Sequence, residues 1–167
     1  MRKPGATRHA KYLLRRASLR DIDTLVRHRR GMFEDMGERN RQALVTSDVV
    51  FRKWVKIALR KKTIVGWIVE VKGRVSGSGC VWLQPALPSP QRETRLVRPY
   101  LFSMFTEPEF RRAGVASRIV SEAIMWCKDN GYQSMLLHAS KKARGLYRKH
   151  GFTRTWEMKR PLKIGQR

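Results

Sequence analysis

The stretch YLFSMFTEPEFRRAGVA, residues 100–116, decides the fold, because a strand, a short loop and the start of a helix follow one another in it. Residues 100–106 are nearly all apolar, which predicts a central strand covered on both faces. After two arginines, Gly114 and Ala116 keep the first turn of the helix free of bulky side chains. The N–H groups and the positive dipole end of such a turn bind phosphate. The stretch therefore predicts a pyrophosphate cradle, with a second interpretation in which the small residues only pack the helix onto the sheet.

A second motif, SKKARGLYRKHGF, occupies residues 140–152. Its apolar and aromatic side chains fall on one helical face, at the spacing i, i+3, i+4 and i+7: Ala143, Leu146, Tyr147 and His150. Gly151 ends this helix, and Phe152 returns to the core. Taken alone, Tyr147 is interpreted as a packed aromatic residue rather than as a catalyst.

The rest of the chain alternates predicted strands with predicted helices, which indicates an α/β or α+β domain with a mixed sheet. Strands are predicted at residues 11–17, 63–71, 74–83 and 133–139, with one or two more from residue 152 onward. Helices are predicted at residues 18–33, where Ser18 and Asp21 form a capping box, and at 47–59, 114–128 and 141–150. Residues 1–10 are predicted to be a basic flexible arm, and residues 11–167 a single domain.

The two motifs together, Arg-x-x-Gly-x-Ala ending at Ala116 and Ala-x-x-x-Tyr-x-x-x-Gly-Phe ending at Phe152, resemble the GNAT superfamily of acetyl-CoA-dependent N-acetyltransferases. The resemblance covers most of the chain and is strongest over residues 101–152. It implies a single-domain GNAT-like fold of the α/β (α+β) class. We therefore expect a mixed sheet of about six or seven strands flanked by about four helices.

The resemblance also implies which residues hold acetyl-CoA. The main chain of residues 102–106 would bind the pantetheine arm, the backbone amides of residues 111–116 the pyrophosphate, and Ser117 would add a hydroxyl. The candidate cofactor-binding residues are Met104, Phe105, Thr106, Arg111, Arg112, Ala113, Gly114, Val115, Ala116, Ser117 and Ser140. The chain departs from the family pattern at Ser140, where many members have Asn, and at Ala116, where a second glycine is commoner.

Acyl transfer from a thioester to an amine needs a base, a stabilised oxyanion and an acid for the departing sulfur, because an alkylamine has a pKa of about 10 and a thiol of about 8.5. In the GNAT resemblance Tyr147 is the acid, and a main-chain N–H near Phe105 could polarise the carbonyl. The base is not identified by the sequence. The carboxylates considered, each of which also reads as a solvated or structural group, are Glu34, Asp35, Glu70 and Glu157, with Glu34 and Asp35 favoured.

An acidic cluster in this basic chain suggests where the acceptor amine enters. Glu34, Asp35 and Glu38 form the densest acidic group, and in GNAT relatives the connection between the first two helices lines the acceptor side of the cleft. The cluster is therefore predicted to attract a cationic amine, against the alternative of a charged helix end that binds nothing.

Composition adds a second class of function. The chain of 167 residues has 37 Lys and Arg against 13 Asp and Glu, a formal net charge of +24. Such an excess favours a polyanionic partner. Two hypotheses follow: an N-acetyltransferase acting on a primary amine of a small molecule or peptide, and a nucleic-acid- or ribosome-associated binding protein that keeps the fold with little catalysis. A generally basic proteome is a third explanation of the charge.

The sparse cysteines and histidines exclude other classes of site. Cys80 and Cys127 lie among apolar neighbours, which predicts buried thiols rather than a disulfide, and a reducing, cytoplasmic location. No histidine spacing fits a metal site, so none is expected. His138 is interpreted as a hydrogen-bonded core histidine, with a side chain that faces the cleft as the alternative. No apolar run reaches the ~18 residues of a membrane helix. A homodimer is left open.

Overall fold

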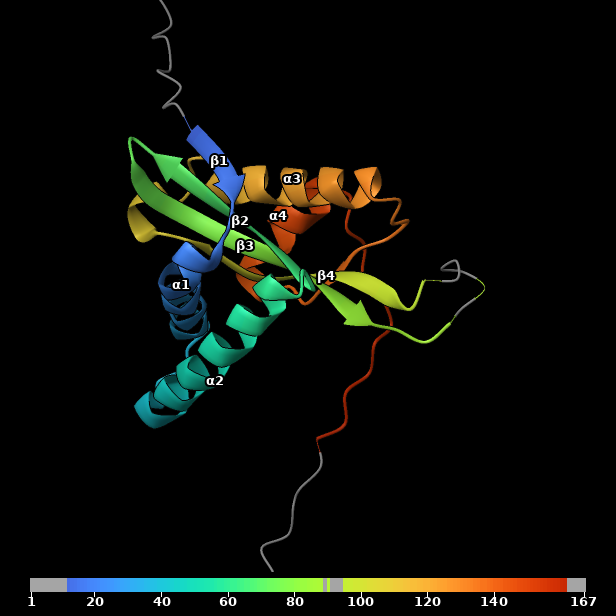
Figure 1. Ribbon diagram of the computed structural model, residues 1–167, viewed down its shortest axis with the longest axis horizontal. Helices are drawn as coiled ribbons and strands as arrows, with labels where there is room; N and C mark the ends of the chain where they lie inside the picture. The colour runs from blue at the N-terminus through green and yellow to red at the C-terminus, as the bar shows by residue number, and fades with distance from the viewer. Residues whose placement is uncertain (1–11, 89, 91–94, 162–167) are drawn as a thin grey trace, which may run out of the picture.

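The computed structural model describes residues 12–88, 90 and 95–161 of the chain, and the predicted basic arm at residues 1–10 lies outside them. A single five-stranded sheet in the order β1-β2-β3-β4-β5 forms the centre of the fold (Figure 1). Its strands are β1 (Tyr12–Arg16), β2 (Ile64–Val71), β3 (Arg74–Pro85), β4 (Val97–Thr106) and β5 (Leu136–Leu137). The first four pair antiparallel, and β5 runs parallel to β4.

The sheet is smaller than the six or seven strands predicted. Of the predicted strand at residues 133–139 only Leu136–Leu137 pairs with β4, and no strand follows it among the residues described up to 161. In the segment after Phe152, where one or two strands were predicted, Trp156 and Met158 are 92% and 95% exposed. A strand with no apolar face to bury gains little from pairing, so this prediction was wrong.

Within the described residues four helices flank the sheet, as predicted: α1 (Ile22–Asp35), α2 (Arg41–Arg60), α3 (Val115–Asp129) and α4 (Arg144–Lys149). The capping box of Ser18 and Asp21 is present just before α1. The start of α2 was predicted too late, because Asn40 caps it by accepting the N–H of Ala43 at 3.0 Å. Ser47 lies inside the helix rather than at its N-terminus.

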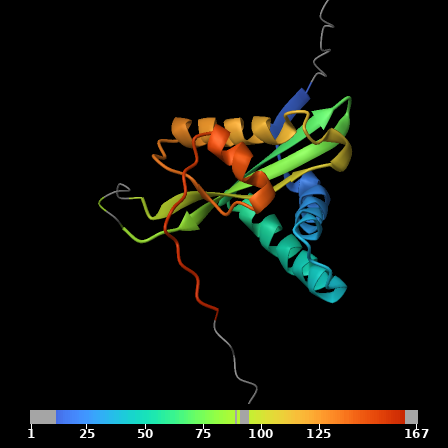
Figure 2. The same ribbon diagram turned by 180° about the vertical axis from the view of Figure 1, so that it is seen from behind.

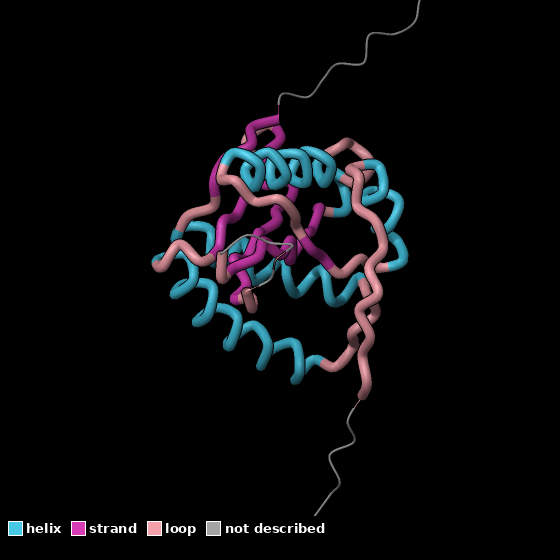
Figure 3. The backbone as a smooth tube through the Cα atoms, turned by 90° about the vertical axis from the view of Figure 1, so that its right-hand side faces the viewer, coloured by secondary structure: helices cyan, strands magenta, loops and turns pink. Residues whose placement is uncertain are grey.

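The helices lie in two layers, one on each face of the sheet. The pair α1 and α2 covers one face and α3 with α4 the other (Figures 1 and 2), so that the strands run between helical layers in Figure 3. Each layer has its own core. The α1–α2 core includes Phe51, Val55 and Ile68, whereas the α3–α4 core includes Trp67 and Ile119.

Both cysteines are buried and unpaired, as predicted, each in a different core. Burial raises the pKa of Cys80 to about 12 and that of Cys127 to about 11, so neither is a thiolate at neutral pH. None of the described helices is long and apolar enough to cross a membrane.

Candidate active site

The C-terminal half of β4 contains a β-bulge and does not pair with β5. Ser78 pairs with Phe105 and Cys80 with Phe102, so β4 carries one more residue than β3 at this point. Ser103, inside this bulge, has a left-handed φ of 51°. The extra residue turns both Phe102 and Ser103 toward the α1–α2 layer, where Phe102 packs on that core. Among the described residues β5 pairs with β4 only at positions 100 and 101, which leaves the edge of residues 102–106 open on that side.

The N-terminus of α3 offers unpaired backbone donors. Gly114 is the residue preceding the helix and has φ of 83°, and Arg112 before it also has a positive φ of 64°. The N–H of Arg118 bonds to the carbonyl of Gly114 at 3.0 Å, so the N–H groups of the preceding turn have no helical acceptor. A Cβ on Gly114 would meet no atom within 4 Å. This turn is therefore open to an anion.

The side chains predicted to surround this turn differ in the contacts that they make. Ser117 hydrogen-bonds the Nε2 atom of His150 at 2.7 Å, which joins α3 to the end of α4. Arg112 is exposed beside Gly114. Arg111 instead donates to the carbonyl of Thr106 at 3.1 Å and to Asp35 at 2.6 Å, so we leave its guanidinium out of the anion site.

Tyr147 lies on α4 with its ring packed edge-on against Phe152, 5.7 Å between centroids. The residue is 7% exposed. Burial, with a smaller contribution from the nearby Tyr100 phenol, raises the pKa of Tyr147 to about 12. The hydroxyl is therefore protonated at neutral pH and can donate a proton. Ser140, the other residue predicted on this side, precedes the 3₁₀ turn that leads into α4.

The contacts that join Tyr100, His138 and Glu157 near the end of β5 were not predicted from the sequence, which indicated His138 and Glu157 only separately. The Tyr100 hydroxyl bonds the Nδ1 atom of His138, and the Nε2 atom of the same ring lies 3.4 Å from a carboxylate oxygen of Glu157. His138 is 70% exposed, so its interpretation as a core histidine was wrong. The available signal was its position immediately after an apolar strand, where a side chain emerges at the sheet edge.

Some of the carboxylates predicted to serve the acceptor amine already bind other groups of the protein. Asp35 binds Arg111, and the Glu38 carboxylate accepts the N–H groups of Arg39 and Asn40 at 2.9 and 2.8 Å, which orders the turn before α2. Glu34 is exposed and makes no ion pair within the described part of the chain. That this acidic cluster attracts a cationic amine stays a prediction. Glu70, by contrast, pairs with Arg15 across β1 and β2 at 2.8 Å.

The described chain thus carries an open strand edge at residues 102–106, an open helix N-terminus at Gly114 and a protonated tyrosine at position 147. The sequence profile of the Acetyltransferase (GNAT) family matches residues 23–152, which includes all three. The chain belongs to the GNAT family. This family consists of acetyltransferases that use acetyl-CoA as cosubstrate.

Individual GNAT relatives agree with this assignment. Human N-acetyltransferase 8 is 30% identical over 92 residues, which cover 53% of this chain and only 38% of the human protein. A GCN5-related N-acetyltransferase from Ralstonia eutropha has a TM-score of 0.84 at 24% identity over 91% of this chain and 99% of its own. An acetyltransferase from Clostridium acetobutylicum, solved with acetyl-CoA, has a TM-score of 0.81 at 25% identity over 91% and 96% of the two chains.

Proposed function

We propose that this GNAT protein transfers the acetyl group of acetyl-CoA to a primary amine. The observation that carries the proposal is the open turn at Gly114, which presents unpaired N–H groups to an anion at the end of the strand whose edge is free. The acetyl-CoA bound by the Clostridium acetobutylicum relative supports it. In this proposal the thioester of acetyl-CoA supplies the activated acetyl group.

Different residues of the chain would bind acetyl-CoA, stabilise the oxyanion and donate the proton. The backbone of Arg112–Ser117 would bind the pyrophosphate, and the open edge of residues 102–106 would align the pantetheine arm by main-chain hydrogen bonds. An N–H group near Phe105 would hold the developing oxyanion. Tyr147, which burial keeps protonated, would donate its proton to the departing thiolate.

The proton on the acceptor amine needs a separate base. His138 is exposed and directly follows Leu137, the last residue of β5 that pairs with β4. Its Nδ1 atom is hydrogen-bonded to the Tyr100 hydroxyl. Its Nε2 atom faces Glu157, which would stabilise a positive charge on the ring. We therefore add His138 to Glu34 and Asp35 as a third candidate for the base.

Two measurements test the proposal. Calorimetric titration with acetyl-CoA should show a saturable site, and the chain should release free CoA thiol when amines are added, with mass spectrometry identifying the acetylated product. Absence of acetyl-CoA binding at millimolar concentration would contradict the proposal.

A nucleic-acid-associated role is a second candidate, supported by a basic strip at the end of α2. The strip consists of the exposed residues Lys53, Lys56, Arg60, Lys61 and Lys62. An RNA ligand that neutralises it should bind with an affinity that falls steeply with salt. Replacing Lys53, Lys56 and Lys61 by Gln should flatten that slope. A salt-independent affinity would contradict this role.

A further inference from the structure

Arg29 is a cation in a partly buried site with no anionic partner. It comes from α1, and its Nε atom is buried without a hydrogen-bond acceptor among the described residues. No carboxylate lies within ion-pair distance of it there. Asp48, the nearest acid to influence it, is bound by Arg30 at 2.6 Å. Since a desolvated charge without a counter-ion is costly, the site is incomplete as it stands.

Aromatic rings hold the Arg29 guanidinium in place. Its carbon lies 4.9 Å from the centroid of Phe33 and 4.6 Å from that of Phe51. Such contacts offset part of the desolvation of a cation, and they fix its orientation, but they supply no negative charge. The arginine is therefore pre-positioned, and its buried N–H group still lacks an acceptor.

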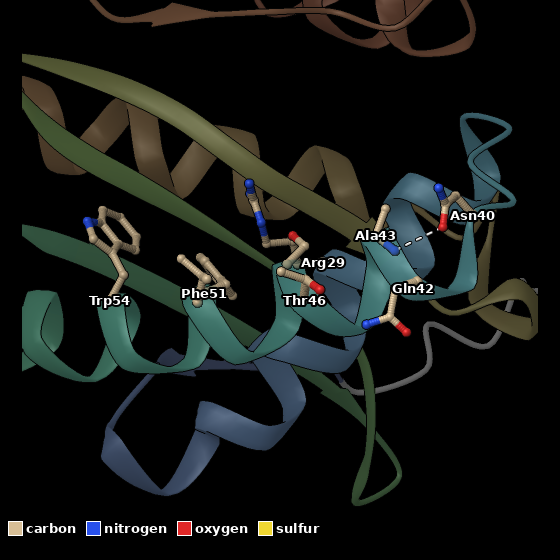
Figure 4. A pocket seen from close by; sticks show the side chains of 9 residues that line it. Arg29, Asn40, Gln42, Ala43, Thr46, Phe51 and Trp54 are labelled. Carbon is tan, nitrogen blue, oxygen red and sulfur yellow. Dashed lines mark hydrogen bonds between the residues drawn. The ribbon is translucent and has the colours of Figure 1, made fainter. Parts of the chain in front are cut away.

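Arg29 of α1 lines a groove of about 780 Å³ whose other lining residues come from α2 and its N-cap. Figure 4 shows Arg29, Phe51 and Trp54 on the side of α2 that faces the sheet. Val50, Phe51 and Trp54 provide an apolar wall, while Asn40 and Thr46 provide polar groups farther along. A groove of this size and composition fits a small molecule that has an apolar body and one anionic group.

Arg29 also touches the bulged strand. Its Nη1 atom donates to the Ser103 hydroxyl at 2.9 Å, and Ser103 is the left-handed residue of the β4 bulge. The edge of this strand is where the proposed function places the acetyl group. An anion held by Arg29 would therefore lie on the α1–α2 side of this strand, near Ser103.

We propose that Arg29 binds the carboxylate of the acceptor, and that the acceptor is an α-amino acid with an apolar side chain whose amine faces the β4 bulge. This proposal rests on the proposed acetyltransferase function and narrows its substrate class. A carboxylate matches the planar fork of a guanidinium, and Arg29 still has its Nη2 group to offer alongside Nη1. Because Arg29 contacts a residue of the bulge directly, we expect the carboxylate and the amine on the same carbon rather than at the distant ends of a polyamine.

The first test uses product pairs that differ only in the carboxylate, on the unmodified protein. N-acetyl-L-phenylalanine and N-acetylphenethylamine would be titrated by calorimetry, together with the free amines as substrates. We expect the carboxylate-bearing member to bind, and its free amine to react, at least about 30-fold better. Equal binding of the two, or binding of neither, would overturn the proposal. Tighter binding of N-acetylphenylalanylalanine, whose carboxylate lies one residue farther out, would also overturn it in favour of a peptide.

The second test removes the cation. Arg29→Met should abolish the preference for the carboxylate, and Arg29→Lys should retain part of it, because the charge remains without the fork. Arg52→Met is the matched control, since it makes the same change of charge at an exposed arginine of α2 that pairs with Asp23. It should keep the preference. Persistence of the preference in Arg29→Met with an unchanged melting temperature would overturn the proposal.

Acetyl-CoA affinity, measured on each variant, separates this proposal from the function on which it rests. If the protein binds acetyl-CoA but reacts equally with amines that have and that lack a carboxylate, the proposed function stands and the carboxylate site is overturned. A protein that binds N-acetyl-L-phenylalanine through Arg29 but not acetyl-CoA keeps the carboxylate site and loses the function.

Discussion

The buried ring of His28 on α1 lies with its Nε2 atom 3.0 Å from a carboxylate oxygen of Glu107, the first residue after β4. On the other side of the ring, Nδ1 lies 2.7 Å from the Ser78 hydroxyl on β3. A neutral ring that donates from Nε2 to Glu107 and accepts at Nδ1 satisfies both contacts. This arrangement fixes the start of the loop that leads to Gly114 against α1.

The first prediction concerns the pH dependence of stability. Burial lowers the pKa of His28 to about 4, so the unfolded chain binds a proton between pH ~6.5 and ~4 that the folded chain does not. Stability should therefore fall as the pH is lowered through this window, by about 2 kcal/mol between pH ~7.5 and ~5. Urea unfolding of the protein and of His28→Gln, which cannot titrate, should show this difference only in the former. Parallel pH profiles for the two would show that His28 is not held neutral.

The second prediction concerns the proton donor. Tyr147→Phe should lower turnover by ~10²–10⁴ while leaving the affinity for acetyl-CoA unchanged, because the ring keeps its packing against Phe152 and loses only the hydroxyl. Tyr132→Phe, a partly buried tyrosine packed on Trp126, is the control and should react normally. Steady-state kinetics with calorimetry measures both. Equal turnover in Tyr147→Phe would mean that another group protonates the thiolate.

The third prediction separates anion binding from backbone strain. Gly114→Glu should abolish acetyl-CoA binding, since it places a negative side chain at the open turn where phosphate is proposed to bind. Gly73→Glu is the matched control: Gly73 has a similar φ of 75°, its Cβ position is equally open, and it lies in the turn between β2 and β3. Both variants carry comparable strain and the same charge. If both lose affinity equally, the effect is not local to the turn.

Sequence reasoning succeeded where a local signal determines the structure. The turn between the strands predicted at 63–71 and 74–83 and the end of the helix predicted at 114–128 were placed correctly. Gly73 and Gly131, which have positive φ, end these elements independently of distant partners. The start of α2 was missed because Asn40 is a single capping residue inside a polar stretch that also reads as a loop. The short β5 was overestimated because the length of an edge strand depends on its neighbour.

The residues that define the site's chemistry were harder to foresee. Arg29 and Ser103 are far apart in the sequence, as are His28 and Glu107, and no spacing rule relates them. The β4 bulge turns Ser103 toward α1, and no turn motif in the sequence marks this register shift. Gly114 and Tyr147 could be named in advance only because their motifs are contiguous in the chain.

The last prediction concerns Gly77 of β3, which packs closely against the backbone of β4. A Cβ on Gly77 would lie 2.7 Å from Val115 Cγ1 and 2.8 Å from the carbonyl oxygen of Phe105, so Gly77→Ala must displace the β4 backbone. We expect a loss of about 1–3 kcal/mol in the free energy of unfolding, together with weaker acetyl-CoA binding, because the displaced segment is the proposed pantetheine edge. Gly145→Ala is the control, since its Cβ would meet nothing in the first turn of α4 and should stabilise the helix by about 0.5–1 kcal/mol. Urea unfolding and calorimetry measure both effects. A Gly77→Ala variant that loses stability but binds acetyl-CoA normally would place the pantetheine arm away from Phe105.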